Sequence, residues 1–135
     1  MTRPPLLTAF SEGGIVPTNP KDLLGIKKCP LGLVPPALKI ATAPAMADGA
    51  RKYGPYNWRE NAVRLSIYLD AIERHLNAYR DGENVAPDSK ISHLAHMAAC
   101  LAIIFDAEGI GKLIDDRPVS GPAPALMEAQ VVKDG

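Results

Sequence analysis

Three histidines fall close together in the second half of the chain, at His75, His93 and His96. A spacing of three places His93 and His96 on one helical face, and a preceding helix packed antiparallel against it brings His75 opposite them. A divalent ion or a phosphate group can then sit between the two helices, because imidazole is a common ligand of manganese, zinc, iron and nickel. Each histidine taken alone also fits an ordinary hydrogen-bonded position, and that alternative stays open.

Carboxylates near the histidines extend this candidate metal site. Asp70 and Glu73 form an i, i+3 pair on the segment that carries His75, and magnesium prefers oxygen ligands of this kind. The two carboxylates equally fit a solvated helix face. The predicted metal ligands are Asp70, Glu73, His75, His93 and His96.

A second cluster combines aromatic and basic side chains in the segment ARKYGPYNWR, residues 50–59. Aromatic rings stack on a nucleobase, an asparagine reads a base edge, and lysine and arginine bind phosphate oxygens. The predicted nucleotide-binding residues are Lys52, Tyr53, Tyr56, Asn57, Trp58 and Arg59. In the structural alternative, Tyr53 and Trp58 anchor a turn under the helices and Arg59 caps a helix end.

Two amphipathic helices must position these residues. Apolar side chains recur every three to five residues over about 60–81 and again over 89–108, which predicts an antiparallel helix pair joined by a short loop. Gly82 ends the first helix, and Asp88 or Ser89 caps the second. The predicted fold class is therefore all-α, a small helical bundle with irregular ends that are rich in proline and glycine.

The rest of the chain is organised around this pair. We predict a flexible arm over residues 1–21, a helical nucleotide-binding domain over 22–113 and an irregular C-terminal tail over 114–135. Pro35 and Pro36 open a further helix, which Pro44 ends or kinks. A length of 135 residues suits one hydrophobic core.

Charge and composition restrict the class of protein. Residues 1–59 carry eight basic and three acidic side chains, a balance of +5, and residues 60–135 carry seven basic and twelve acidic ones, a balance of −5. A zero total is not typical of a duplex nucleic-acid binder. The sequence lacks both a secretory signal and a membrane-length apolar run, so we expect a cytoplasmic protein. Cys29 and Cys100 are expected to be reduced.

The chain resembles a phage-encoded family of dATP/dGTP diphosphohydrolases, related to the MazG-like all-α nucleotide pyrophosphohydrolases. The motifs that carry the resemblance are NPKDLLGIKKCPLGLVPP at 19–36, GARKYGPYNWRE at 49–60, ERHLNAYRDGE at 73–83, SHLAHMAACLAIIFDAE at 92–108 and IDDRP at 114–118. The resemblance implies a homo-oligomer in the host cytoplasm. It also implies hydrolysis of a purine deoxynucleoside triphosphate to the monophosphate and pyrophosphate, with Mg²⁺ or Mn²⁺ as cofactor.

Two features, the histidine pair and Lys90, depart from the family pattern. The MazG-like pattern places metal-binding E-x-x-E on one helix and E-x-x-D on the next, where this chain has Asp70-x-x-Glu73 and His93-x-x-His96. Imidazoles thus replace two carboxylates. Lys90 stands where the family's loop before the histidine helix has glycine.

The resemblance also implies how the residues would divide the chemistry. A metal-activated water attacks a phosphorus atom, Glu83 or Glu73 orients or deprotonates it, and Lys52 and Arg59 neutralise charge. The predicted catalytic residues are Glu73, Glu83 and His93. The alternative is a non-catalytic protein that sequesters a nucleotide or a cyclic-nucleotide signal. A phosphohydrolase of the HD type ranks last, because no adjacent His-Asp pair exists.

Overall fold

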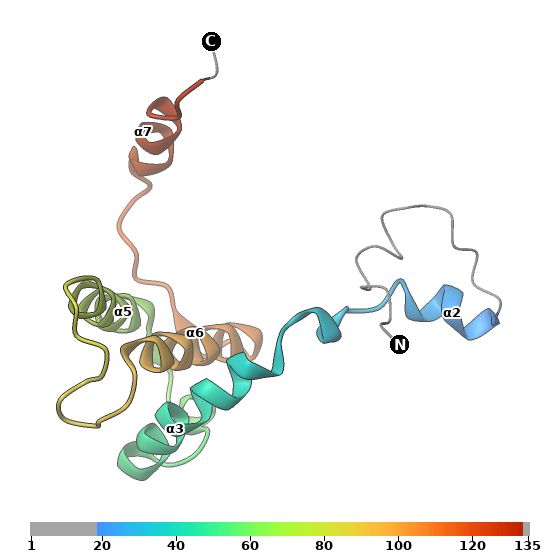
Figure 1. The fold of residues 1–135 in the computed structure, drawn as a ribbon, viewed down its shortest axis with the longest axis horizontal. Helices are drawn as coiled ribbons and strands as arrows, with labels where there is room; N and C mark the ends of the chain where they lie inside the picture. Colours follow the sequence, from blue (N-terminus) through green and yellow to red (C-terminus); the bar gives the residue numbers. More distant parts are fainter. Residues whose placement is uncertain (1–18, 134–135) are drawn as a thin grey trace. The chain divides into compact units, whose positions relative to one another are not determined.

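The computed structural model describes residues 19–133, which are mostly helical (Figure 1). Chain order runs α2 (Pro20–Gly25), a 3-10 turn (Leu31–Leu33), α3 (Pro36–Tyr53), α4 (Asn57–Glu60), β1 (Val63–Arg64), α5 (Leu65–Arg80), α6 (His93–Gly109), β2 (Leu113–Ile114) and α7 (Ala123–Ala129). The predicted all-α class is confirmed. The chain divides into two compact units, Met1–Ala41 and Thr42–Gly135. Residues 1–18 of the predicted arm lie outside the described residues, and the predicted division at 21 and 113 stays a prediction.

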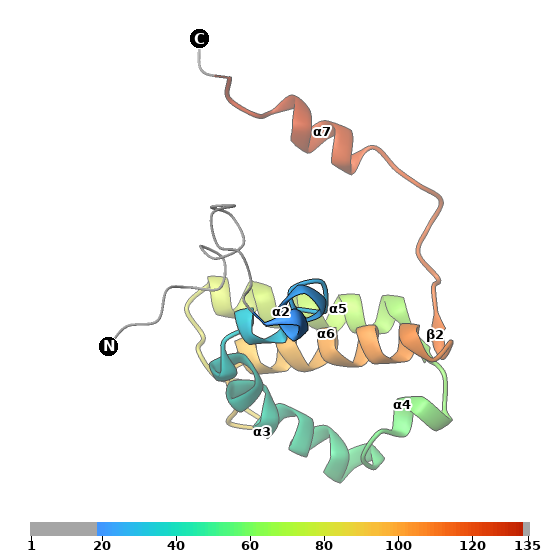
Figure 2. The same cartoon turned by 90° about the vertical axis from the view of Figure 1, so that its right-hand side faces the viewer.

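Helices α5 and α6 form the predicted antiparallel pair and lie side by side (Figure 2). Helix α5 begins later than predicted because Val63 and Arg64 form a strand, paired in parallel with Leu113 and Ile114 at the far end of α6. The loop that follows α5 starts at Gly82, whose φ of 105° is one that glycine adopts without a steric penalty.

Helix α6 begins at His93 because Ser92, one residue earlier, is its N-cap. The Ser92 side chain accepts a hydrogen bond from the backbone N–H of Leu94 at 3.1 Å. The prediction of Asp88 or Ser89 as the cap is wrong. Ser89 Oγ instead accepts from the N–H of Ile91 at 3.2 Å, within the loop.

The backbone conformation of the loop before α6 shows why glycine suits the position of Lys90. The backbone of Lys90 is left-handed, with φ of 63°, a conformation that glycine adopts freely and a residue with a Cβ adopts at a cost. The N–H of Lys90 donates to the carbonyl of Ala86 at 2.8 Å, and this turn holds the lysine in place.

Helix α3 continues through Pro44 to Tyr53, so of the two predicted alternatives, that Pro44 ends or kinks the helix, the first is wrong. Proline removes one helical hydrogen bond, but packing on both sides of the interruption can compensate. Ala45 directly after it is buried and packs with Ala95 and Ala99 of α6. As a consequence, residues 50–53 are helical and do not form the predicted loop.

The buried core of the described residues consists mostly of alanine. Its members are Ala45, Trp58, Leu65, Ala86, Ala95, Ala99 and Ala107, with His93 as a buried polar residue. Small side chains let the helix backbones approach closely. No large side chain of residues 19–133 is fully buried.

The C-terminal segment is more regular than expected. Strand β2 and the seven-residue helix α7 lie in the part predicted to have little regular structure. Asp116, between them, accepts hydrogen bonds from the N–H and hydroxyl of Ser66 at 2.8 and 2.5 Å, which satisfies an N-terminal donor of α5. None of the helices described here is long and apolar enough to span a membrane.

Candidate functional site

The three histidines converge between α5 and α6. His75 lies in the second half of α5, while His93 and His96 lie in the first turn of α6. The rings of His75 and His96 stack with centroids 4.7 Å apart and planes 9° apart. The rings of His75 and His93 are 5.1 Å apart and tilted by 53°. We call these three residues the histidine cluster.

Hydrogen bonds connect the histidine cluster to the loop between the helices. His75 Nδ1 and His93 Nδ1 are 2.8 Å apart, and His93 Nε2 is 2.7 Å from Glu83 Oε1. His96 Nε2 is 2.7 Å from Ser89 Oγ. The loop therefore holds two of the three rings from outside the helix pair.

Burial favours the neutral form of two of these rings. Burial lowers the pKa of both His75 and His96, because desolvation penalises the imidazolium form. Around His96, the carboxylates of Asp48 and Asp88 oppose this effect and Lys52 adds to it. The cluster thus has charged groups of both signs beside it, contributed by α3 and by the loop.

Lys52 is the cation of α3 that faces this region. Its Nζ lies 3.0 Å from Asp48 Oδ2, one helical turn away, and Arg51 contacts the same carboxylate at 3.3 Å. The hydrogen bond to Asp48 raises the pKa of Lys52. An exposed i, i+4 pair of this kind is weak, so the ammonium group can exchange its partner for a stronger anion.

At the other end of the aromatic and basic segment, Trp58 and Arg59 both bind Asp106, and we call these three residues the clamp. Asp106 Oδ2 accepts from Trp58 Nε1 at 2.6 Å, and the Asp106 carboxylate binds Arg59 in a bidentate pair at 2.8 and 2.9 Å. These bonds lower the pKa of Asp106 to about 2, with Arg59 as the larger cause and Trp58 as the second. Trp58 is only 6% exposed. The clamp fixes α4 against the second half of α6.

Comparison with known proteins agrees with this reading of the motifs. Residues 18–117 match the family model described as dATP/dGTP diphosphohydrolase, N-terminal. The chain belongs to this family. It is also similar to a dATP/dGTP diphosphohydrolase of Salmonella phage PMBT28, with 31% identity over 110 residues, which cover 78% of this chain and 37% of that protein. The chain thus matches little more than a third of the relative's length. No solved structure matches it.

The matched span of the dATP/dGTP diphosphohydrolase N-terminal family contains both the histidine cluster and the clamp. The predicted resemblance to the phage family is confirmed, and a relation to MazG-like proteins stays a prediction. The sequence did not predict that Asp48, Ser89 and Asp106 contact the predicted site residues. Asp106 and its partner Arg59 are 47 positions apart, and no local spacing pattern links residues so distant in the chain.

The structure separates the predicted nucleotide-binding residues into two groups. Lys52 and Tyr53 end α3, and Lys52 acts electrostatically on His96, whereas Trp58 and Arg59 bind Asp106. Asp106 follows His96 by ten residues along α6, about 15 Å at 1.5 Å per residue.

Two further predicted residues flank the clamp. Arg59 lies 4.5 Å above the centre of the Tyr56 ring, which covers one face of that ring. Asn57 is the first residue of α4, and its carbonyl accepts from the N–H of Asn61 at 2.9 Å.

The predicted carboxylates do not join the predicted imidazoles. Asp70 and Glu73 are exposed on α5, and no hydrogen bond within residues 19–133 links either of them to the histidine cluster. The same residues contain no group of three or more His, Cys, Asp or Glu side chains arranged to hold a metal ion. In this part of the chain the donor set does not fit a resident divalent metal, because both nitrogens of His93 are hydrogen-bonded to His75 and Glu83, and the predicted carboxylates do not reach the cluster.

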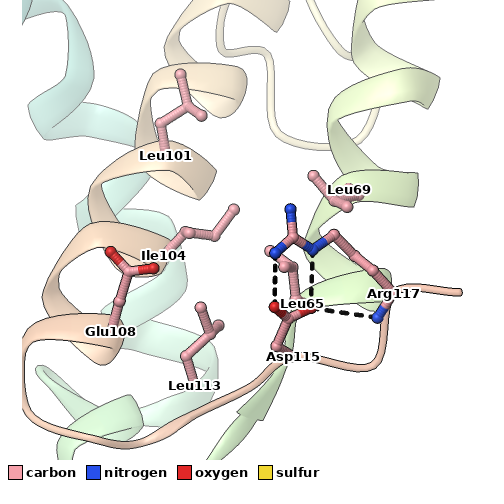
Figure 3. Close-up of a pocket in the computed structure, with 8 residues that line it drawn as sticks. All are labelled: Leu65, Leu69, Leu101, Ile104, Glu108, Leu113, Asp115 and Arg117. Carbon is pink, nitrogen blue, oxygen red and sulfur yellow. Dashed lines mark hydrogen bonds and ion pairs between the residues drawn. The ribbon is translucent and has the colours of Figure 1, made fainter. Parts of the chain in front are cut away.

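A pocket on the helix pair lies away from the histidine cluster and is mostly apolar. Figure 3 shows leucines of α5 and α6 around a pocket of about 400 Å³, with the Asp115–Arg117 ion pair at its edge. The lining residues are Leu65, Leu69, Leu101, Ile104, Glu108, Leu113, Asp115 and Arg117. The pocket contains two carboxylates and one guanidinium, a charge balance that does not attract a triphosphate.

Proposed function

We propose that this chain hydrolyses a purine deoxynucleoside triphosphate, dATP or dGTP, to the monophosphate and pyrophosphate at the histidine cluster. The observation that carries the proposal is the convergence of the histidine cluster: Glu83, His93 and His75 are linked by contacts of 2.7 and 2.8 Å, and the His96 ring stacks on His75. Family membership supports the nucleotide, since the matched phage relative is named as a dATP/dGTP diphosphohydrolase. The alternative, sequestration without turnover, has no comparable support.

The divalent ion in this proposal is part of the substrate. Nucleoside triphosphates bind Mg²⁺ or Mn²⁺ through their phosphate oxygens, and Mg²⁺ is usually held by substrate phosphates with few protein ligands. This fits a site whose described residues lack a complete metal-binding set. The metal–nucleotide complex, rather than the free triphosphate, is therefore the species that the protein recognises.

Two cations beside the histidine cluster and one exposed aromatic ring provide the groups that bind the nucleotide. Lys52 and Arg74 act electrostatically on the cluster and can neutralise phosphate charge. Tyr53 is 71% exposed at the end of α3, directly after Lys52, so its ring is available to stack on a purine. Arg59 is excluded from this role because Asp106 already satisfies its guanidinium.

The test is incubation of the pure protein with each deoxynucleoside triphosphate and either Mg²⁺ or Mn²⁺, followed by separation of the products. The expected result is metal-dependent release of pyrophosphate and the matching monophosphate from dATP or dGTP, with slower release from dCTP and dTTP. Recovery of intact nucleotide in a 1:1 ratio with protein would instead support sequestration. Neither product nor bound nucleotide would reject both roles.

The functional form in this proposal is a homo-oligomer. Apolar side chains on the α5 and α6 pair stay exposed, among them Ile67 at 59%, Leu101 at 47% and Phe105 at 71%. A core made mostly of alanine provides limited burial on its own, and apolar surface of this kind is typical of an interface.

Phe105→Asp is accordingly expected to lower the solution mass measured by light scattering from that of an oligomer to that of a monomer. A charge placed at the centre of an apolar interface must be desolvated without a partner. Lys112→Asp, a charge change outside the exposed apolar set, is the control and should leave the mass unchanged. A wild-type protein that is monomeric at all concentrations would contradict the proposal.

A further inference from the structure

The direction of each hydrogen bond in the Glu83, His93 and His75 chain follows from the chemistry of its members. A carboxylate only accepts, so the 2.7 Å contact requires a proton on His93 Nε2. With His93 neutral, its Nδ1 carries a lone pair, and the 2.8 Å contact between the two Nδ1 atoms then takes its proton from His75.

The remaining nitrogen of His75 is open. With Nδ1 protonated, the Nε2 atom of neutral His75 carries a lone pair. Within residues 19–133 this atom has no hydrogen-bond partner, and those residues contain no buried side-chain nitrogen or oxygen that lacks one. His75 Nε2 therefore reaches solvent as a hydrogen-bond acceptor, beside the stacked ring of His96.

The surroundings of His75 favour this neutral form. Burial lowers the pKa of His75, and the neighbouring His96, His93 and Arg74 lower it further, while Asp88 opposes them. Burial and the neighbouring basic side chains outweigh Asp88 and keep the lone pair available near neutral pH.

The other members of the cluster are already engaged. Both ring nitrogens of His93 are used, and the residue is only 4% exposed. Glu83 is bound to His93. The tautomer of His96 is not fixed in the same way, because Ser89 Oγ can either donate to His96 Nε2 or accept from it.

We propose that His75 Nε2 is the general base of this site and that Glu83 and His93 are positioning residues that fix its tautomer. The inference rests on the proposed function for the identity of the reaction. Nε2 takes one proton from water while the water oxygen bonds to a phosphorus atom of the α–β bridge. The bond from that phosphorus to the bridging oxygen breaks, its electron pair leaves with that oxygen, and His75 later returns the proton to the departing phosphate group or to solvent.

During proton transfer, Glu83 and His93 stabilise the positive charge that forms on His75. The new imidazolium keeps its Nδ1–H directed at His93 Nδ1, and His93 keeps its Nε2–H directed at the Glu83 carboxylate. The negative charge of Glu83 thus acts on His75 through an oriented ring.

The first test measures the tautomers without any nucleotide. Nitrogen-15 NMR of the labelled full chain at neutral pH should show His75 protonated on Nδ1 and His93 protonated on Nε2. A His75 that is protonated on Nε2 would overturn the proposal, because that atom could not then accept a proton. This result stands whether or not the protein hydrolyses a nucleotide.

The second test uses kinetics. His75→Asn keeps a donor for His93 but cannot accept a proton, so kcat should fall by about 10²–10⁴-fold with little change in KM. Glu83→Gln should lower kcat less and move the acid limb of the kcat profile to lower pH, a shift that a merely structural role would not produce. Glu108→Gln, near the opposite end of α6, is the matched control and should leave kcat and the profile unchanged.

Unchanged kcat in His75→Asn would overturn the base assignment. If the wild-type protein hydrolyses no deoxynucleoside triphosphate, the proposed function is rejected, and the attack by water with it. The NMR result would still show which nitrogens of His75 and His93 carry protons.

Discussion

His93→Ala is expected to reduce dGTP or dATP hydrolysis by about 10²–10⁴-fold, the usual contribution of a positioned acid–base group. The truncation removes two hydrogen bonds at once, to Glu83 and to His75. His75 then loses the acceptor that fixes its tautomer, and Glu83 loses its connection to the cluster. Initial rates at saturating nucleotide and metal measure the effect.

Because His93 is buried, its loss also disturbs packing, and the experiment must separate the two causes. Circular dichroism melting identifies a temperature at which wild type and variant are both folded, and rates are compared there. Leu94→Ala truncates the next side chain of α6, which is 47% exposed, and should keep activity within about twofold. Undiminished hydrolysis by folded His93→Ala would remove the histidine cluster from the reaction.

Local patterns in the sequence predicted the helix pair and the meeting of the histidines. The apolar period placed α5 and α6, and the spacing of three placed His93 and His96 on one face. Antiparallel packing then required His75 to lie opposite. Each of these steps depends on residues a few positions apart or on one packing rule.

The features that the sequence left undetermined depend on contacts across the chain. Ser89 and Ser92 both suit an N-cap, and the choice follows from loop pairing, in which the N–H of Ala86 donates to the carbonyl of Ile91 at 2.8 Å and Val85 forms a bridge with Ser92. Pro44 is a second example, because the local rule predicts that proline interrupts a helix and tertiary packing overrides it. Propensity alone could not weigh these contacts.

The aromatic and basic segment shows the same limit at the site itself. Residue types that suit nucleotide binding also suit a clamp, and composition does not distinguish the two. Only the position of Asp106, which accepts from Trp58 and pairs with Arg59, assigns those side chains to structure. The same argument leaves Lys52 and Tyr53 for the ligand.

Trp58→Ala is expected to lower the free energy of unfolding by about 3–5 kcal/mol, the usual cost of truncating a buried tryptophan. Trp58 is the largest side chain in a buried hydrophobic set that otherwise consists of alanines and one leucine, so its neighbours cannot fill the cavity. Urea unfolding followed by circular dichroism measures the loss.

Trp58→Phe separates the clamp from nucleotide binding. Phenylalanine keeps an aromatic ring for stacking but cannot donate to Asp106, so a clamp predicts lower stability with unchanged KM, whereas a tryptophan that only stacks on a base predicts unchanged stability.

Acid titration tests in a second way whether Trp58 stabilises the fold through its hydrogen bond to Asp106 or through its ring alone. The pKa of Asp106 is lowered from 3.8 to about 2, so its stabilising contribution is complete above 3.8 and is lost as the pH falls toward about 2. The stability difference between wild type and Trp58→Phe should therefore shrink over that interval, because protonated Asp106 no longer holds the ion pair that aligns it with the indole N–H. A difference that stays constant down to pH 2 would mean that Trp58 stabilises the fold through its ring alone.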